Sequence, residues 1–204
     1  MARLLMAKSA RRHPLLIYSR LFAVWRFPTL LIGAILLVLA WLAPGPLADE
    51  RLRLLLALGA AASLLLFGYS LLGPRWSYVQ CRPTHLRLST PFFPLAISYS
   101  RIYTARPVPF EPANVRWTEE SLVRPFLGMT MLALDLTGYP VPLRWLRLLL
   151  NRFLLPERFI GLQLLVPDWM ALSRDIEVYR SQWAMREHDR SRGDALTSLT
   201  MPRR

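Results

Sequence analysis

The sequence predicts a membrane protein: a transmembrane α-helical hairpin followed by an α+β, mainly β domain of antiparallel strands closed by a C-terminal amphipathic helix. Two long stretches without a charged residue predict the hairpin, and short segments of alternating apolar and polar residues predict the strands. Apolar side chains that recur at helical spacing after Pro167 predict the closing helix.

The composition is unusual for a soluble protein of this size. Hydrophobic residues make up 53% of the 204 residues and the mean hydropathy is +0.27, yet 26 Lys and Arg stand against 13 Asp and Glu. A soluble chain so apolar would need a larger core than this length encloses, so we expect lipid to surround part of it. Cys81 is the single cysteine, which excludes an internal disulfide and fits a reducing compartment.

Residues 27–48 and 54–74 contain no charged side chain and consist mostly of Leu, Ala, Gly and aromatic residues. A helix needs about 20 apolar residues to cross a bilayer, and both stretches reach that length. They lack the alternation of a transmembrane β-strand, so we expect two helices, with buried helices of a soluble core as the alternative. The connection contains Pro44-Gly45-Pro46, which predicts an antiparallel hairpin.

Small side chains recur along the second stretch and would let another helix approach closely. That helix is either the first span or a helix of a partner chain. The residues expected in this packing are Ala57, Gly59, Ala61 and Ser63.

The basic residues predict the orientation. The first 26 residues carry six basic and no acidic residues, whereas the charges of the hairpin loop cancel. Because basic residues stay on the cytoplasmic side, we expect both termini in the cytoplasm. Leu and Phe interleave with the basic residues of the N-terminal segment, which favours a segment lying along the membrane surface; a disordered basic tail is the alternative.

After Pro74 the sequence becomes typical of a β-rich domain. Alternating segments separated by proline-containing turns predict an antiparallel meander, in which Leu95, Ile97 and Tyr99 point inward. The proline-bearing residues 106–125 are predicted as a loop. The predicted strands are 76–82, 86–90, 95–101, 130–136 and 159–166.

A closing helix is predicted after Asp168, whose carboxylate can accept hydrogen bonds from free backbone amides at a helix start. One face of this helix is apolar and the other is charged, and the pattern continues to about Glu187. The apolar face consists of Trp169, Leu172, Ile176, Tyr179 and Trp183.

Two phrases of the strand region carry a resemblance to a known family. Tyr78-Val-Gln-Cys-Arg-Pro-Thr-His-Leu-Arg-Leu88 and Ala96-Ile-Ser-Tyr-Ser-Arg-Ile102 are similar to the first hairpin and to the I-P-Y-x-x-I strand of bacterial pleckstrin-homology-like (PH-like) domains, with Ser98 in place of proline. The resemblance covers residues 76–187. It implies a PH-like domain that follows two transmembrane helices in a bacterial inner membrane, but no lipid-headgroup specificity, because the first hairpin lacks a Lys-x-Arg motif.

Residues 143–155 combine arginine with large apolar residues between two prolines. A helix here would lie at an anionic membrane surface, where each arginine contributes about 1 kcal/mol. An irregular strand with solvated arginines is the alternative. The expected membrane-surface contacts are Arg144, Trp145, Arg147 and Arg152.

The sequence gives little support for catalysis. His13, His85 and His188 have no partner at metal-ligand spacing, and there is neither a phosphate-binding glycine loop nor a nucleophile elbow. Only a cleft that joined Cys81, His85 and Asp135 would favour a lipid-modifying enzyme. We expect no catalytic residue, cofactor, metal or nucleic acid, because membrane topology accounts for the positive charge.

We therefore expect a non-enzymatic, membrane-anchored PH-like interaction or scaffolding module at the cytoplasmic face. Its expected partners are the lipid bilayer, anionic lipid headgroups and a protein of unknown identity. The alternative is an accessory subunit of a larger membrane complex. The predicted domains are a basic N-terminal segment (1–26), the hairpin (27–74), the PH-like domain (75–187) and a disordered polar tail (188–204).

Overall fold

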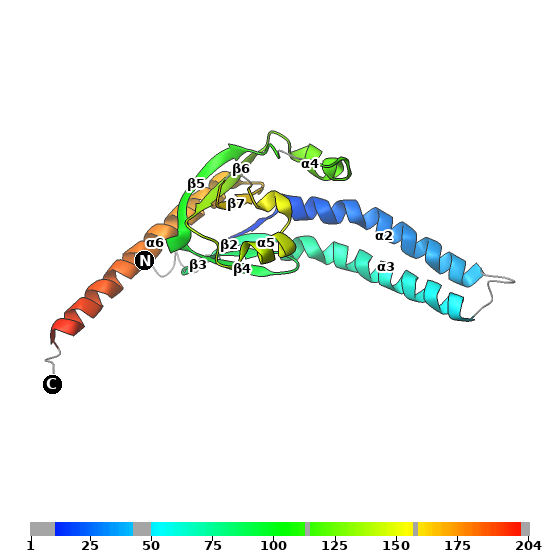
Figure 1. Ribbon diagram of the computed structural model, residues 1–204, viewed down its shortest axis with the longest axis horizontal. Helices are drawn as coiled ribbons and strands as arrows, with labels where there is room; N and C mark the ends of the chain where they lie inside the picture. The colour runs from blue at the N-terminus through cyan, green and yellow to red at the C-terminus, as the bar shows by residue number, and fades with distance from the viewer. Residues whose placement is uncertain (1–10, 43–49, 113–114, 157–158, 201–204) are drawn as a thin grey trace.

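The computed structural model describes residues 11–42, 50–112, 115–156 and 159–200. A helical hairpin projects from one end of a domain built on two antiparallel sheets, and a long C-terminal helix leaves the other end (Figure 1). This architecture agrees with the predicted fold class at the level of a helical hairpin plus a sheet domain with a C-terminal helix.

The hairpin consists of α2 (Leu16–Leu42) and α3 (Glu50–Trp76). Ser63 is buried on α3, and its Oγ donates a hydrogen bond of 2.7 Å to the backbone oxygen of Thr29 on α2. Gly33 of α2 lies close enough to α3 that a Cβ would sit 3.3 Å from the Leu64 side chain. The helices therefore pack through small residues, as is common for helices in membranes.

The small residues expected in helix packing divide between two faces of α3. Ser63 faces α2, and a Cβ on Gly59 would lie 3.2 Å from Leu36 of that helix. Ala57 and Ala61 are exposed on the rest of the helix surface.

The first sheet contains four strands in the order β1-β2-β3-β4. Leu95, Ile97 and Tyr99 are buried, as the alternation predicts, and the Tyr99 hydroxyl donates to the backbone oxygen of Arg82 at 2.8 Å. The strands are β1 (Arg12–Pro14), β2 (Tyr78–Cys81), β3 (His85–Ser89) and β4 (Pro94–Ser98).

The hairpin is inserted between two neighbouring strands of this sheet. Strand β1 precedes α2 directly, β2 follows α3 directly, and His13 pairs with Val79. The pairing continues at the junction, where the Leu15 amide donates to the Ser77 oxygen at 3.1 Å. The prediction of a separate segment on the membrane surface is therefore wrong for residues 12–22, because strand pairing and the burial of Leu15 and Phe22 hold them in the sheet domain; residues 1–10 lie outside the described part.

The second sheet has the order β5-β6-β7. The predicted loop at 106–125 is wrong in part, because β5 extends through Pro107 and Pro109. Alternate residues of a strand direct their backbone amides to the same side. Both prolines, which have no N–H to donate, can therefore face the open edge of the sheet, while Arg106 and Val108 form the backbone hydrogen bonds with β6. The strands are β5 (Ile102–Pro109), β6 (Thr130–Leu136) and β7 (Gly161–Leu164).

Helix α6 (Trp169–Thr200) closes the domain. Asp168 accepts from the Ala171 amide at 2.9 Å, as predicted for a cap, and Leu172 and Ile176 are buried in the core. Asp175 accepts a hydrogen bond of 3.0 Å from Nε2 of the buried His13, which joins α6 to β1. The helix continues to Thr200, so the prediction of a disordered tail from residue 188 is wrong over that range.

Candidate functional site

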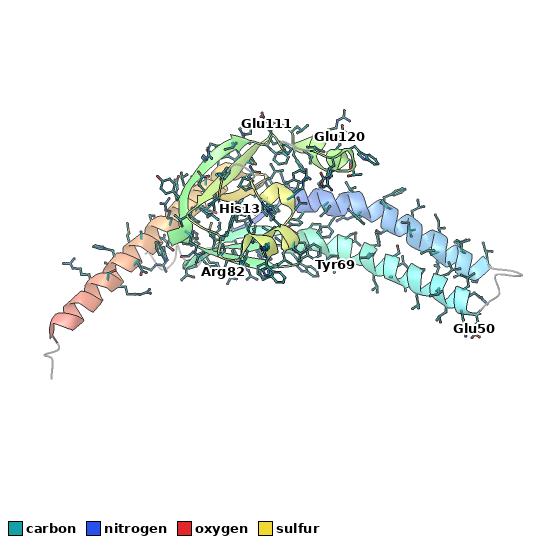
Figure 2. All side chains as sticks on the ribbon, in the orientation of Figure 1. His13, Glu50, Tyr69, Arg82, Glu111 and Glu120 are labelled. Atoms are coloured by element: carbon teal, nitrogen blue, oxygen red, sulfur yellow. The ribbon has the colours of Figure 1, made fainter. Side chains whose placement is uncertain are left out.

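The candidate site lies where the hairpin leaves the sheet domain. Helix α2 changes its surroundings there: Phe22 is 6% exposed, whereas Trp25 and Phe27 are 59% and 71% exposed. Tyr69 of α3 lies at this level, and Glu50 marks the far end of the hairpin (Figure 2). The Tyr69 ring contacts those of Phe22 and Trp76, with centroid distances of 5.8 Å and 5.9 Å.

Exposed aromatic side chains gather at the hairpin end of the domain. We call this set the aromatic belt; it consists of Trp25, Trp76, Phe92, Trp117 and Trp145. Their elements lie at the same end of the long axis, as the positions of α4 and α5 in Figure 1 show. Trp rings exposed beside apolar helices, which four of these five residues provide, are typical of the boundary between membrane and water.

Helix α5 (Leu143–Leu149) occupies the first half of the segment 143–155, so this part is helical and not an irregular strand. Leu146 is fully buried, whereas Arg144, Trp145 and Arg147 are exposed. A short 3-10 helix, η5 (Arg152–Leu154), follows. The amide of Asn151 donates to the Tyr18 hydroxyl of α2 at 3.0 Å, which fixes this region against the hairpin.

Residues 117–126 form three short helical segments that the sequence did not predict, and α4 packs against α2. Apolar Leu122 and Val123 are buried, which pulls the segment onto the domain. The segments are η3 (Trp117–Glu119), α4 (Glu120–Val123) and η4 (Arg124–Phe126).

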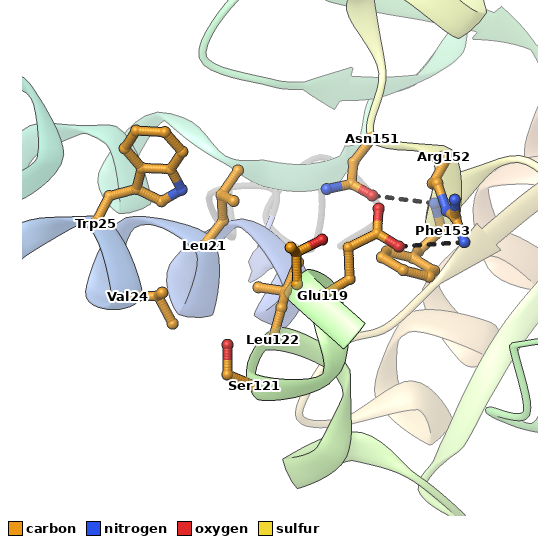
Figure 3. A pocket seen from close by; sticks show the side chains of 10 residues that line it. Leu21, Val24, Trp25, Glu119, Ser121, Leu122, Asn151, Arg152 and Phe153 are labelled. Atoms are coloured by element: carbon orange, nitrogen blue, oxygen red, sulfur yellow. Dashed lines mark hydrogen bonds and ion pairs between the residues drawn. The ribbon is translucent and has the colours of Figure 1, made fainter. Parts of the chain in front are cut away.

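A cleft of about 430 Å³ lies between α2, the η3–α4 segment and η5; we call it the interface cleft (Figure 3). Its α2 wall is apolar, and the opposite wall carries hydroxyl, carboxylate, amide and guanidinium groups. It is lined by Leu21, Val24, Trp25, Thr118, Glu119, Ser121, Leu122, Asn151, Arg152 and Phe153.

Glu119 and Arg152 point toward one another in the cleft (Figure 3). The guanidinium Nη2 of Arg152 lies 3.3 Å from Oε2 of Glu119, which also accepts from the Arg116 amide at 3.2 Å. Their side chains are 42% and 24% exposed, so neither charge is fully desolvated. The guanidinium also lies over the Phe153 ring, 5.0 Å from its centroid.

Sequence reasoning identified Arg152 but not its carboxylate partner. Glu119 lies in the segment 106–125, which the sequence predicts as a loop, and its only sequence signal is the acidic pair with Glu120. Arg144, Trp145 and Arg147 lie outside the lining of the cleft, on the exposed surface of α5.

Cys81, His85 and Asp135 have separate surroundings. Burial, together with the nearby Asp175 carboxylate, raises the pKa of the Cys81 thiol to about 12, which leaves it protonated. Partial burial and neighbouring arginines lower the pKa of His85, whose Nδ1 lies 2.9 Å from the Thr84 hydroxyl. Asp135 lies on the second sheet and pairs with Arg106 at 3.1 Å. The cleft that would have favoured a lipid-modifying enzyme is therefore not formed by these three residues.

No protein-family model, curated protein or solved structure matches this chain. Among the residues that the structure describes, no group of three His, Cys, Asp or Glu side chains is placed to hold a metal ion. The geometry of the hairpin and of the interface cleft is thus the basis for the function.

Proposed function

We propose that this chain is a non-enzymatic interaction module with a PH-like fold, anchored in a membrane by α2 and α3 and facing the cytoplasm. One observation carries the proposal: the apolar surface of both helices is exposed. Each helix has 27 residues, their most apolar windows have mean hydropathies of 2.1 and 2.0, and only 17% of each window is buried inside the chain. A helix in a soluble core is mostly buried, whereas the part of these helices beyond the sheet domain exposes its apolar side chains and would lie in the hydrocarbon region of the bilayer.

The strand arrangement supports the PH-like part of the proposal. Two antiparallel sheets of four and three strands lie against a single C-terminal helix, which is the plan that the sequence resemblance implies. The placement of the hairpin between β1 and β2 adds a feature to that plan, since the first strand comes from before the membrane helices.

The junction gives the proposed anchor a mechanical role. Because paired strands continue into paired helices, the domain is held in a fixed pose rather than on a flexible linker. Arg144 and Arg147 would then face the headgroup region, each contributing about 1 kcal/mol at an anionic surface. A partner protein would meet the remaining domain surface at a defined height above the bilayer, which raises its effective concentration there.

Two engineered cysteines test the anchoring, and the native Cys81 is silent because it is 2% exposed with a protonated thiol. Leu65 of α3 and Tyr103 of β5 are 75% and 72% exposed, so they form a matched pair, and β5 carries none of the proposed membrane contacts. In opened membrane vesicles we expect a membrane-impermeant maleimide to label the Tyr103→Cys protein and to leave the Leu65→Cys protein unlabelled, because lipid covers residue 65. After denaturation in detergent, both proteins should be labelled at the engineered cysteine when Cys81, which unfolding exposes, is replaced by Ser.

The two outcomes separate anchoring from orientation. Labelling of Leu65→Cys in intact membranes would show that water reaches the helix and would overturn the membrane anchor. Labelling of Tyr103→Cys in unopened cells would leave the anchor in place but would overturn the cytoplasmic orientation.

A further inference from the structure

We propose that the interface cleft binds the headgroup of one membrane phospholipid that carries an ammonium group as well as its phosphate, as phosphatidylethanolamine does. This inference rests on the proposed membrane anchoring and assigns a ligand to a site that anchoring itself does not require.

The position of the cleft fits a headgroup. Its volume of about 430 Å³ lies within the range of sites that enclose small ligands. Trp25 lines the cleft and belongs to the aromatic belt, so the cleft opens at the level where indole rings meet lipid headgroups.

The apolar wall of the cleft continues along α2 away from the domain. Val24 lines the cleft, and Phe27 and Leu31 follow at helical spacing on the same side of the helix, with exposed fractions of 71% and 48%. An acyl chain that left the cleft would follow this stripe into the hydrocarbon region. A water-soluble ligand would make no use of the stripe, which favours a lipid.

The opposite wall carries one negative and one positive group side by side. Arg152 can bind a phosphate through charge-assisted hydrogen bonds, and Glu119 can accept from a primary ammonium group. The hydroxyls of Thr118 and Ser121 also line the cleft and can hydrogen-bond to phosphate oxygens. A headgroup with a phosphate alone would draw Arg152 away from Glu119 and leave that carboxylate without its cationic partner, so the cleft should select a zwitterionic headgroup.

Lipid retention by the full-length protein tests the selection. The protein is purified in mild detergent, mixed with equal amounts of phosphatidylethanolamine and phosphatidylglycerol, and weighed by native mass spectrometry. We expect one bound lipid, with phosphatidylethanolamine exceeding phosphatidylglycerol about tenfold, because one charge-assisted hydrogen bond distinguishes them. Equal retention of the two lipids, or none of either, would overturn the inference.

Single substitutions assign the selection to the two charges. Glu119→Gln should lower the ratio of bound phosphatidylethanolamine to bound phosphatidylglycerol about tenfold. The ammonium group loses its carboxylate partner, and phosphatidylglycerol is no longer repelled by that carboxylate. Arg152→Gln should lower the retention of both lipids by the same factor, because both headgroups contain a phosphate. Glu120→Gln is the matched control, because Glu120 is exposed and lies outside the cleft lining. The same change of ratio in Glu119→Gln and Glu120→Gln would contradict the proposal.

A third variant leaves the ion pair intact and guards against misfolding of the charge variants. Ser121 is exposed in the cleft, so Ser121→Trp should fill the site and lower lipid retention at least tenfold; unchanged retention would refute the site. The maleimide test on Leu65→Cys, run on the same membranes, separates the two proposals. A protected cysteine without lipid preference overturns only the cleft, whereas a labelled cysteine overturns the anchor and the cleft with it.

Discussion

The two parts of helix α2 have similar apolar residues but different surroundings. In the part nearest the sheets, Ile17, Tyr18 and Phe22 are at most 6% exposed because they belong to the core of the domain, where α3 and α4 also pack against α2. In the part from Phe27 to Leu42, most large apolar side chains are about half exposed or more, and only the face toward α3 is covered. We call these the near part and the far part of α2.

This difference shows that hydropathy identifies the helix but does not identify its solvent. The near part is continuous with β1 and is stabilised by protein contacts, so its packing should govern the stability of the domain. The far part has no such contacts on its outer side, where truncation of a side chain exchanges protein atoms for equally apolar lipid. The bilayer would then stabilise the far part of α2, whereas the core of the sheet domain stabilises the near part.

The largest expected effect comes from a truncation in the near part. Phe22 packs edge-on against Tyr69 at 5.8 Å and lies against Gly73, where a Cβ would collide with its ring. Phe22→Ala should lower the free energy of unfolding by about 3–5 kcal/mol through lost burial and the cavity left behind. Thermal unfolding of the full-length protein in detergent micelles, followed by circular dichroism, measures the change.

The matched control for Phe22→Ala is a truncation in the far part. Leu37 is 53% exposed, so Leu37→Ala should leave the unfolding midpoint nearly unchanged in micelles. A comparable loss in both variants would mean that the two parts share one kind of surroundings, and the comparison would fail.

The second expected effect concerns the strand that introduces the near part. Only 3% of the His13 side chain is exposed, and its Nε2 donates to the Asp175 carboxylate, so β1 is fastened to α6 across the domain. His13→Ala should cost about 1–3 kcal/mol, because it removes a buried charge-assisted hydrogen bond. The same thermal unfolding assay measures it.

Arg11 provides the control for His13. Its guanidinium lies 3.7 Å from Asp168, and both side chains are about half exposed or more, so water screens the pair. Arg11→Ala should change stability by less than about 1 kcal/mol. Equal losses of stability for the two variants would contradict this prediction, because the buried contact of His13 would then contribute no more than the exposed ion pair of Arg11.

Local patterns in the sequence account for the elements that were predicted correctly. Alternation placed Leu95, Ile97 and Tyr99 inside β4 and the turn after it, and helical spacing placed Leu172 and Ile176 on the buried face of α6. These predictions succeed because burial of one face imposes a period of two on a strand and of about 3.6 on a helix.

The elements that were missed depend on partners distant in the sequence. Strand β1 has three residues and gains its identity only by pairing with β2, which follows the entire hairpin. Strand β5 contains Pro107 and Pro109, whose fit to a sheet edge cannot be recognised until the neighbouring strand is known. Glu119 of the cleft was missed for the same reason, since Arg152 reaches it only through the fold.

The smallest expected effect concerns the face of the far part that meets α3. The Ser63 hydroxyl donates to the Thr29 oxygen across the two helices, and Ser63→Ala should cost about 0.6 kcal/mol, the typical size of such a bond between membrane helices. Ser70→Ala is the matched control, because Ser70 is also buried on α3 but its hydroxyl donates to Phe67 within the same helix. Thermal midpoints in micelles should therefore fall more for Ser63→Ala than for Ser70→Ala. Equal thermal midpoints for the two variants would show that the hydrogen bond does not contribute to the packing of α2 against α3. Close packing at Gly33 and Gly59 would then account for the association of the two helices.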